Sequence, residues 1–322
     1  MTLKVTQETF DSLTDEWRTL AEACHAPVFA TPAWLRTWWD SCRSTEELML
    51  LAFREGNEAK GIAPLMRIDD TIRFIAYSDI CDYHDFPFSG IGGGEFYTSL
   101  LDELDRTAWR SLELDGLTED SPTLQALPEL AKGRGWSVDV ALEEVSPRIP
   151  VQPTWEEYQN ALGKKDRHEL RRKLRRLGAA GDINYYNVTN PRSGDVADVL
   201  TLLKASREAK AAFLTPEKER FFHNLAESMA EQNHLKLFFL ELDGVRVAAS
   251  FCFDYKKGYY LYNSGYDVHY AQLSVGLLLK ALCLKSAIED GKEVFDLLRG
   301  SESYKYHLGA QDYGVHRLTI QR

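Results

Sequence analysis

Cysteine is scarce in this chain, and its placement excludes the usual cysteine-based sites. The five cysteines are scattered over 322 residues without a Cys-x-x-Cys pair, which argues against a disulfide framework or a structural zinc site. No run is long and apolar enough to cross a bilayer, and the N-terminus has no apolar secretion segment. We therefore expect a cytoplasmic protein without a membrane span.

Several catalytic signatures are also missing. The chain has no Gly-x-Ser-x-Gly elbow, no Walker phosphate loop and no His-Glu-x-x-His motif. The glycines at 90–94 lack both the strand-to-helix setting and the acidic partner that a dinucleotide-binding unit needs. The eight histidines do not cluster at metal-ligand spacing, so no metal site is predicted.

Charge is divided unevenly along the chain. Residues 1–150 hold 13 Lys and Arg against 27 Asp and Glu, whereas residues 151–322 hold 25 against 22. Much of this second-half basic charge lies in Lys164–Arg176, where leucines at helical spacing predict an amphipathic helix. Like charges four residues apart repel, so we expect the helix to bind an anion: the phosphates of a cofactor, a nucleotide or RNA. Arg172 and Arg176 are its predicted cofactor-binding residues.

The predicted elements follow the same order twice. In each half, helices lead into a strand hairpin, a further strand, a loop, a helix and another strand. The segments Leu112–Gly116 and Phe295–Gly300 occupy equivalent positions in the two copies, and Pro147–Pro153 separates the copies. The sequence therefore predicts two domains, 1–150 and 151–322, each an α/β (α+β) unit with a mixed, mostly antiparallel sheet flanked by helices.

The stretch richest in chemistry follows the predicted strand Glu293–Leu298. Four charged side chains of both signs fall within ten residues there: Asp296, Arg299, Glu302 and Lys305. Ligands bind beyond the carboxyl ends of strands in open α/β sheets, so this cluster is a candidate site. The alternatives are a solvated loop with a surface ion pair, or a buried Asp296–Arg299 pair that fixes the turn.

This order of elements resembles the GNAT acyltransferase fold, in which the pyrophosphate of acyl-CoA rests on amides at a helix N-terminus. The corresponding stretch is 270–277. The familiar pattern Q/R-x-x-G-x-G/A is matched at Gln272, whereas the glycine arrives one place late, at Gly276. The resemblance implies that acyl-CoA binds here, at Gln272, Ser274, Val275 and Gly276.

Nearly the whole chain is similar to a more specific family, the CelD-like acetyltransferases named for cellulose biosynthesis, which are relatives of the Fem aminoacyltransferases. The matching segments are Phe29–Trp39, Ile62–Leu65, Ser78–Asp85, Leu170–Leu177 and Phe295–Lys305. The resemblance implies tandem GNAT-like domains. The second domain would hold the acyl donor, and the acceptor would bind between the two, with the first domain as the acceptor side.

The same resemblance implies catalytic roles. Fem enzymes carry an aromatic–lysine pair after a similar strand–glycine motif, and Tyr304-Lys305 matches that pair. Lys305 would stabilise a developing oxyanion or hold an acceptor anion. Asp296 or Glu302 would accept the amine proton, and Arg299 would orient either carboxylate. Tyr304 would protonate the departing thiolate.

Five side chains are predicted to contact the acceptor besides Arg299. Asp82, His84 and Asp85 come from a polar segment of the first half, and Tyr262 and Tyr266 precede the helix that starts near Ser274. His84 and its aspartates could instead hold a metal, but a polar substrate loop is the favoured interpretation.

Three functions stay open at this point. The favoured one is an enzyme, a GNAT-type N-acyltransferase that moves an acyl group from acetyl-CoA or another acyl-CoA to the amine of an amino sugar, amino acid or similar small polar acceptor. The second is a Fem-like transferase that uses aminoacyl-tRNA, disfavoured by the shortened segment Ser301–Ser303 and the absence of a coiled-coil arm. The third is a non-catalytic GNAT-like binding protein, which the late Gly276 keeps open. No DNA partner is expected.

Overall fold

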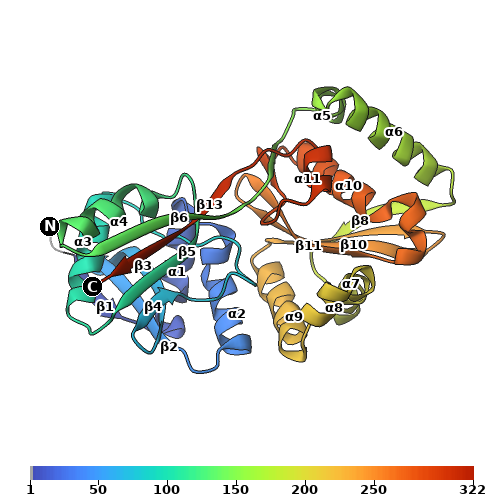
Figure 1. The fold of residues 1–322 in the computed structure, drawn as a ribbon. Coiled ribbons are helices and arrows are strands. Elements are labelled where there is room, and N and C mark those ends of the chain that lie inside the picture. Colours follow the sequence, from blue (N-terminus) through green and yellow to red (C-terminus); the bar gives the residue numbers. More distant parts are fainter. Residues whose placement is uncertain (1–2) are drawn as a thin grey trace. The chain divides into compact units, whose positions relative to one another are not determined.

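Residues 3–322 are described by a computed structural model and form two compact units (Figure 1). The first unit contains the chain up to Val145 together with residues 313–322, and the second contains Ser146–Asp312. Each unit is a mostly antiparallel sheet with helices on its faces. The predicted fold class is thus confirmed. Within residues 3–322, every helix is too short or too polar to cross a membrane.

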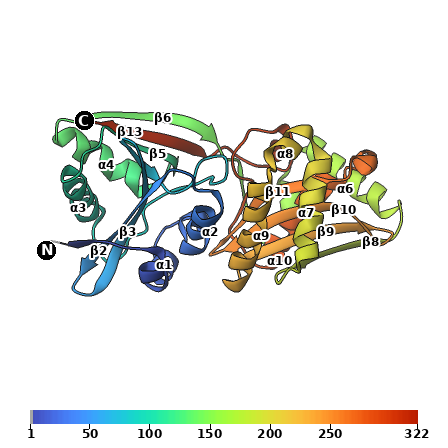
Figure 2. The ribbon, with the colours of Figure 1, turned by 90° about the horizontal axis from the view of Figure 1, so that it is seen from below.

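The first unit is built on a seven-stranded sheet with the order β1-β2-β3-β4-β5-β13-β6. Its strands are β1 (Lys4–Gln7), β2 (Glu47–Glu55), β3 (Glu58–Ile68), β4 (Thr71–Phe74), β5 (Ser111–Thr118), β6 (Ser137–Val145) and β13 (Gly314–Gln321). Its helices are α1 (Phe10–Ala23), the 3-10 turn η1 (Val28–Ala30), α2 (Pro32–Cys42), α3 (Gly93–Asp105) and α4 (Pro122–Gly133). Helices α1 and α2 cover one face of the sheet, and α3 and α4 cover the other (Figure 2).

Helix starts follow the capping signals of the sequence. Thr31 accepts a hydrogen bond from the Trp34 amide, and Pro32 takes the first helical position of α2. Ser121 and Pro122 begin α4 in the same way. These caps explain why element starts could be placed from sequence alone.

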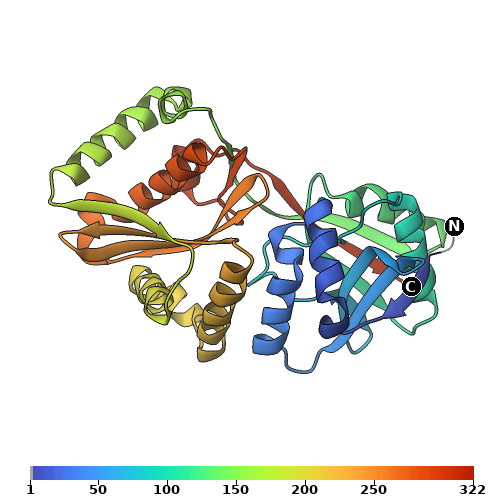
Figure 3. The ribbon, with the colours of Figure 1, turned by 180° about the vertical axis from the view of Figure 1, so that it is seen from behind.

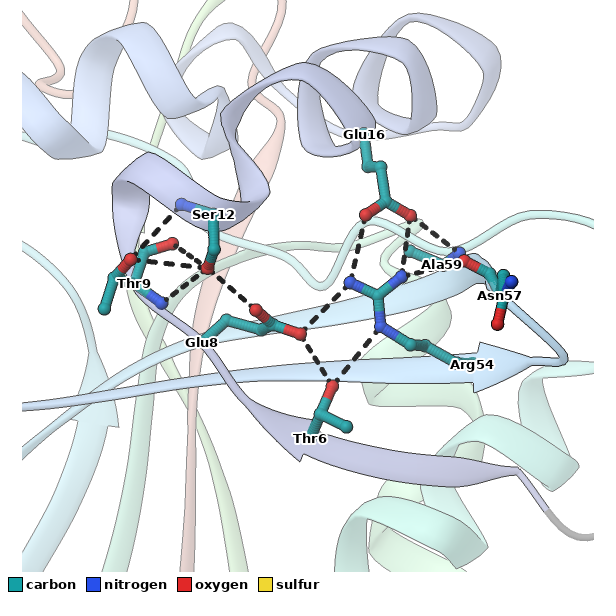
Figure 4. A network of polar contacts seen from close by, with 8 residues as sticks. All are labelled: Thr6, Glu8, Thr9, Ser12, Glu16, Arg54, Asn57 and Ala59. Carbon is teal, nitrogen blue, oxygen red and sulfur yellow. Dashed lines mark hydrogen bonds and ion pairs between the residues drawn. The ribbon is translucent and has the colours of Figure 1, made fainter.

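A network around Arg54 ties α1 to the first strands (Figure 4). The guanidinium donates to Glu16 at 2.8 and 3.0 Å, to Glu8 at 3.1 Å and to Thr6 at 3.3 Å. Arg54 and Glu8 are each only 14% exposed. Hydrogen bonds from Arg54 lower the pKa of Glu16. Burial tends to raise the pKa of Glu8, but hydrogen bonds from Ser12, Thr6 and Arg54 outweigh it and lower that pKa.

The second unit is built on a six-stranded sheet with the order β7-β12-β11-β10-β9-β8. Its strands are β7 (Arg148–Pro150), β8 (Ile183–Val188), β9 (Leu235–Leu242), β10 (Val245–Tyr255), β11 (Gly258–Tyr266) and β12 (Val294–Asp296). Its helices are α5 (Trp155–Ala161), α6 (Lys164–Gly178), α7 (Ser193–Ser206), α8 (Glu208–Phe213), α9 (Pro216–Glu231), the 3-10 turn η2 (Val268–Leu273), α10 (Val275–Glu289) and α11 (Ser303–His307). Helices α6 and α10 lie on one face of this sheet, and α7 and α9 on the other (Figures 1 and 3).

The prediction that the second domain extends to residue 322 is wrong, because the last ten residues belong to the first unit. Strand β13 pairs antiparallel with both β5 and β6, so the last ten residues complete the first sheet. Val315, Leu318 and Ile320 are fully buried there. The alternation of these residues predicts a strand, but it carries no information about which sheet the strand joins.

Two consecutive helices of the second unit are separated by a single residue. Arg207, whose backbone is extended (φ −160°, ψ 140°), lies between α7 and α8. The sequence has no proline or glycine at this point, so nothing local signals the break. The break turns α8, with Lys210, toward the end of β11.

Candidate functional site

Strands β11 and β12 separate after a short parallel pairing. Within β11, only Gly258–Tyr260 pairs with Val294–Asp296 of β12, whereas β11 continues to Tyr266. The chain after β12 turns away through Leu298 (φ 57°) and Gly300 (φ 104°). A leucine in the left-handed region costs about 1–2 kcal/mol, so other contacts must hold this turn.

Lys305 stabilises this turn through hydrogen bonds to its backbone. Its ammonium donates to the carbonyl oxygens of Leu298 (2.8 Å), Arg299 (2.7 Å) and Gly300 (2.8 Å). Its side chain is 2% exposed, and its Nζ lies 3.1 Å from a carboxylate oxygen of Glu302. Three carbonyls match the three hydrogens of an ammonium group. In this geometry Lys305 positions the loop and has no hydrogen left for an oxyanion.

Asp296 is likewise part of the scaffold. Its side chain is fully buried and accepts from Arg148 Nε at 2.6 Å and from the Leu298 amide at 2.8 Å. Ser146 Oγ lies 3.4 Å from the same carboxylate. The buried-pair interpretation was therefore correct in kind for Asp296, and Arg148 on β7 is a partner that the sequence did not suggest. Arg148 is distant in sequence, and only the pairing of β7 with β12 brings it there.

Glu302 and Tyr304 reach the open side of the turn. The Glu302 side chain is 44% exposed. Burial tends to raise its pKa, but the charge of Lys305 outweighs burial, so the pKa is lowered and Glu302 is a carboxylate at neutral pH. Burial raises the pKa of Tyr304, which stays a neutral phenol. Arg299 is half-buried beside them.

Helix α10 begins at a strained, uncapped residue. Ser274 is the N-cap with φ 60° and ψ 32°, and it gives the first turn no side-chain cap. Arg176 of α6 donates to Ser274 Oγ at 3.2 Å, while its Nε is buried without a hydrogen-bond partner among the described residues. Val275 is buried and Gln272 is exposed. Open amides and a spare guanidinium hydrogen at a helix N-terminus suit a phosphate.

The late glycine of the pattern has a packing role. A Cβ at Gly276 would lie 2.6 Å from the ring of Tyr266 on β11. Gly276 thus lets β11 and the first turn of α10 approach each other, which explains why a glycine is needed at this position even though the pattern is shifted by one residue.

A pocket of about 690 Å³ lies beside this helix start. Its apolar part comes from Leu170, Leu277 and Leu308. Its polar lining comes from α6 and α11: Lys164, Lys165, Asp166, His168, Glu169, Lys173 and His307. Lys164 and Lys165 have no carboxylate within 4 Å among the described residues, so the pocket is rimmed by uncompensated positive charge. Arg172, predicted to bind the cofactor, instead forms a two-point pair with Glu169 at 2.7 and 2.8 Å.

Two lysines near the separated strands were missed by the sequence reasoning. Lys280 of α10 is 8% exposed, and its Nζ donates to the Gly276 carbonyl at 3.1 Å and lies 4.8 Å from the Tyr304 ring. Lys210 of α8 donates to Asn263 Oδ1 at 3.0 Å and to the Ser264 carbonyl. The available signal was a single lysine inside the apolar run 277–284. Lys210 had no signal, because the break at Arg207 brings it to β11.

The two predicted tyrosines lie on different faces of the sheet. Tyr266 packs toward α10, whereas Tyr262 packs among Phe222, Phe251 and Phe253. A register shift lies between β10 and β11 here, and Tyr262 is the extra residue. A bulge adds one residue to the two-residue period, so residues four apart need not share a face.

The predicted acceptor residues of the first unit are mostly internal. His84 is 2% exposed, and its Nδ1 lies 3.3 Å from the Asp115 carboxylate. Asp85 is 6% exposed and accepts from the Phe86 amide, Ser121 and Thr123. These partners explain Asp85 as a support of the loop, whereas the buried Nε2 of His84 has no hydrogen-bond partner among the described residues. Asp82 is only half-buried.

A comparison with models of known protein families matches most of the second unit. A family model described as an acetyltransferase (GNAT) domain matches residues 164–306, from the start of α6 into α11. No curated protein matches the chain.

Solved structures match over both units. FemX matches 98% of this chain and 96% of its own with a TM-score of 0.68 and 12% identity. The C-terminal domain of a protein named as a lysylphosphatidylglycerol synthetase, from Agrobacterium fabrum, matches 98% of this chain and 92% of its own (TM-score 0.62, 11% identity). A tandem GNAT protein from the clavulanic acid biosynthesis pathway matches 98% of both chains (TM-score 0.54, 11% identity). The chain therefore has a tandem GNAT fold, and the narrower CelD-like resemblance stays a prediction.

Proposed function

We propose that this protein is an N-acyltransferase that takes its acyl group from acyl-CoA and delivers it to the amine of a small polar acceptor. The observation that carries the proposal is the uncapped start of α10. Its first amides and Ser274 form a site for a phosphate group beside a pocket rimmed by cations, together with Arg176, whose buried Nε has no hydrogen-bond partner within residues 3–322.

The residues present fit an acyl-CoA. The α10 amides and Arg176 would hold its pyrophosphate, because helix N-termini and guanidinium groups both favour anions. Lys164 and Lys165 would meet its remaining phosphate, and the leucines of the 690 Å³ pocket would cover its apolar parts. When bound, acyl-CoA supplies a thioester, whose acyl carbon bonds to the acceptor nitrogen as the carbon–sulfur bond breaks.

Glu302 and Tyr304 are the proposed proton carriers. The Glu302 carboxylate would accept a proton from the acceptor amine, and the neutral Tyr304 phenol would give one to the departing sulfur. Lys305 and Asp296 act through them as positioning residues, because each fixes the turn between β12 and α11.

Thermal unfolding tests the donor. The full chain is unfolded with acetyl-CoA, longer acyl-CoAs and deacylated total tRNA, at low and moderate salt. We expect an acyl-CoA to raise the melting temperature in a concentration-dependent way, as site binding requires. Arg176→Met should weaken that response, whereas the matched control Arg172→Met should not, because Arg172 is paired with Glu169 on the surface. An unchanged response in Arg176→Met would contradict the assignment of the phosphate site.

A second candidate donor is aminoacyl-tRNA. It is favoured by the cations of α6 and by the fold shared with FemX and the lysylphosphatidylglycerol synthetase domain. In that case tRNA should stabilise the protein, and the effect should fall steeply with salt because phosphate contacts release counterions. If none of these ligands changes the melting temperature, the result would instead favour a non-catalytic GNAT-like protein.

A further inference from the structure

Three cations around the separated ends of β11 and β12 have no carboxylate partner. Among residues 3–322, no carboxylate oxygen lies within 4 Å of the charged groups of Arg207, Lys210 or Lys280. Glu302 is the nearby acid, and it is already paired with Lys305. Buried charges in proteins are normally paired, so this cluster has an excess of positive charge.

Lys280 is the most deeply buried of the three cations. The residue is only 8% exposed. The described residues offer it one hydrogen-bond acceptor, the Gly276 carbonyl, and one aromatic face, that of Tyr304. An ammonium has three hydrogens, so two of them lack an acceptor within the protein.

Lys210 approaches from α8, on the other side of the sheet from α10 (Figure 3). It can do so because β12 leaves β11 after Tyr260, so the edge of β11 at Asn263 and Ser264 has no strand beside it. Lys210 donates to both of these residues. The gap between the strands therefore receives a lysine from each face of the sheet.

The charges of the cluster act on one another. Burial is the largest effect that lowers the pKa of Lys280 to about 8, and the charge of Arg207 acts in the same direction. Burial, then Lys280 and Arg207, lower the pKa of Lys210 to about 7. Glu302 opposes both effects, and the Cys252 and Cys283 thiols also face Lys280. An anion placed among these cations would relieve their repulsion.

Strand β10, which pairs with β11, contributes a further buried polar group. Ser250 is fully buried, and its hydroxyl has no hydrogen-bond partner among the described residues. It lies on β10 between Ala248 and Cys252, on the face that packs against α10, and directly opposite Ser264 on β11. The strand that borders the gap thus lies between this hydroxyl and the gap.

We propose that Lys210 and Lys280, with the exposed Arg207 at the rim, bind a carboxylate or phosphate group of the acyl acceptor. The acceptor is therefore an anionic amine, such as an amino acid or an amino-sugar phosphate. This inference rests on the proposed acyl transfer. It uses different residues from the donor site, where the cations are Arg176 and those of α6.

Matched pairs of probes test the inference. The full chain is titrated at constant ionic strength with glucosamine 6-phosphate against glucosamine, and with alanine against alaninamide, while thermal unfolding is followed. In at least one pair, we expect the member that carries the phosphate or carboxylate to stabilise the protein and the member without that group to have no effect. The phosphate pair and the carboxylate pair distinguish the two sources of the anion. The response should be larger at pH 6 than at pH 9, because Lys210 and Lys280 lose their protons in this range.

Variants locate the response. Lys280→Met and Lys210→Met should each weaken the apparent affinity at least about tenfold, as expected when one partner of a buried charge contact is removed. Without ligand, the Lys280→Met variant should melt at the same temperature as the unchanged protein or at a higher one, because the substitution removes an uncompensated buried charge. If either core variant does not fold, the exposed Arg207→Gln carries the test with a smaller loss of affinity. Lys285→Met, an exposed lysine of the same helix, is the control.

Three results would overturn the inference. They are no stabilisation by either anionic probe, a response that Lys280→Met, Lys210→Met and Arg207→Gln all leave unchanged, and competition of the anionic probe with CoA, which would assign the cluster to the donor. Acetyl-CoA is titrated separately in the absence of the probes. Loss of that response alone would refute the proposed donor and leave the anion site standing.

Discussion

Replacement of Lys305 separates a chemical role from a structural one. The sequence resemblance implies that this lysine takes part in transfer, whereas its ammonium is used up by the carbonyls of Leu298, Arg299 and Gly300. Lys305→Met keeps the length of the side chain and removes all three donors. The variant therefore asks what the ammonium does for the fold before asking what it does for catalysis.

The expected magnitude follows from those three contacts. A buried polar group left without a partner costs about 1–3 kcal/mol. Leu298 is buried, but Arg299 and Gly300 are half-exposed, so water can reach their carbonyls. The loop can also release the left-handed strain of Leu298, which is worth about 1–2 kcal/mol. We therefore expect a loss near the lower end of the sum, about 3 kcal/mol in the free energy of unfolding.

Thermal unfolding followed by circular dichroism measures this loss. For a unit of this size, about 3 kcal/mol corresponds to a fall of roughly 6–12 °C in melting temperature. Lys285→Met is the matched control, because its Nζ lies 3.4 Å from Glu289 on an exposed helix surface. Such pairs contribute about 0.5 kcal/mol or less. The control should melt with the unchanged protein.

The opposite result would refute the reasoning. If Lys305→Met melts within about 2 °C of the unchanged protein while the rate of CoA release falls about 10²–10³-fold, as loss of an oxyanion donor commonly does, the ammonium would act in the chemistry. A fall in both stability and rate, with activity partly recovered at low temperature, would match the positioning role.

Further predictions concern other parts of the fold. Arg54→Met should lower the stability of the first unit by about 2–4 kcal/mol, because it leaves the carboxylates of Glu8 and Glu16 unpaired; urea unfolding measures this. Both carboxyl pKa values are lowered in the folded state, so the stabilisation is present above their ordinary value of 4.5 and is lost as the pH falls below it. The difference in stability between Arg54→Met and the unchanged protein should therefore shrink in acid. A difference that stays constant with pH would contradict the network. Gly276→Ala should cost about 1–3 kcal/mol by overpacking against Tyr266 and should weaken the response to acyl-CoA, whereas Gly178→Ala, with nothing near its Cβ, should not. A chain that stops after Asp312 should lose the cooperative unfolding of the first unit, because each of the three buried apolar side chains of β13 contributes about 1.5–3 kcal/mol; a native first unit in that truncated chain would disprove the role of β13.

The local pattern of the sequence was sufficient for most elements. Caps such as Thr31-Pro32 and alternating apolar residues fix where helices and strands begin, and the order of elements is enough to indicate a tandem α/β fold. The candidate site could be located only to its strand end. The partner of Asp296 depends on the pairing of β7 with β12, and the face of Tyr262 depends on a bulge. These features arise from long-range pairing, which one sequence does not encode in any local signal.

A difference between the two units supports the proposed donor site in the second. Both contain a short parallel strand pair, β4 with β5 and β11 with β12. The N-cap of the helix that follows the loop is Gly92 in the first copy and Ser274 in the second. In the first copy Lys60, whose side chain lies beside Gly90 of the loop, is paired with Glu58 at 2.7 Å. In the second copy the buried Nε of Arg176 has no hydrogen-bond partner among residues 3–322. Because a phosphate needs a cation that the protein has not already neutralised, the divergence of the two copies leaves the second as the one equipped to hold an anionic donor.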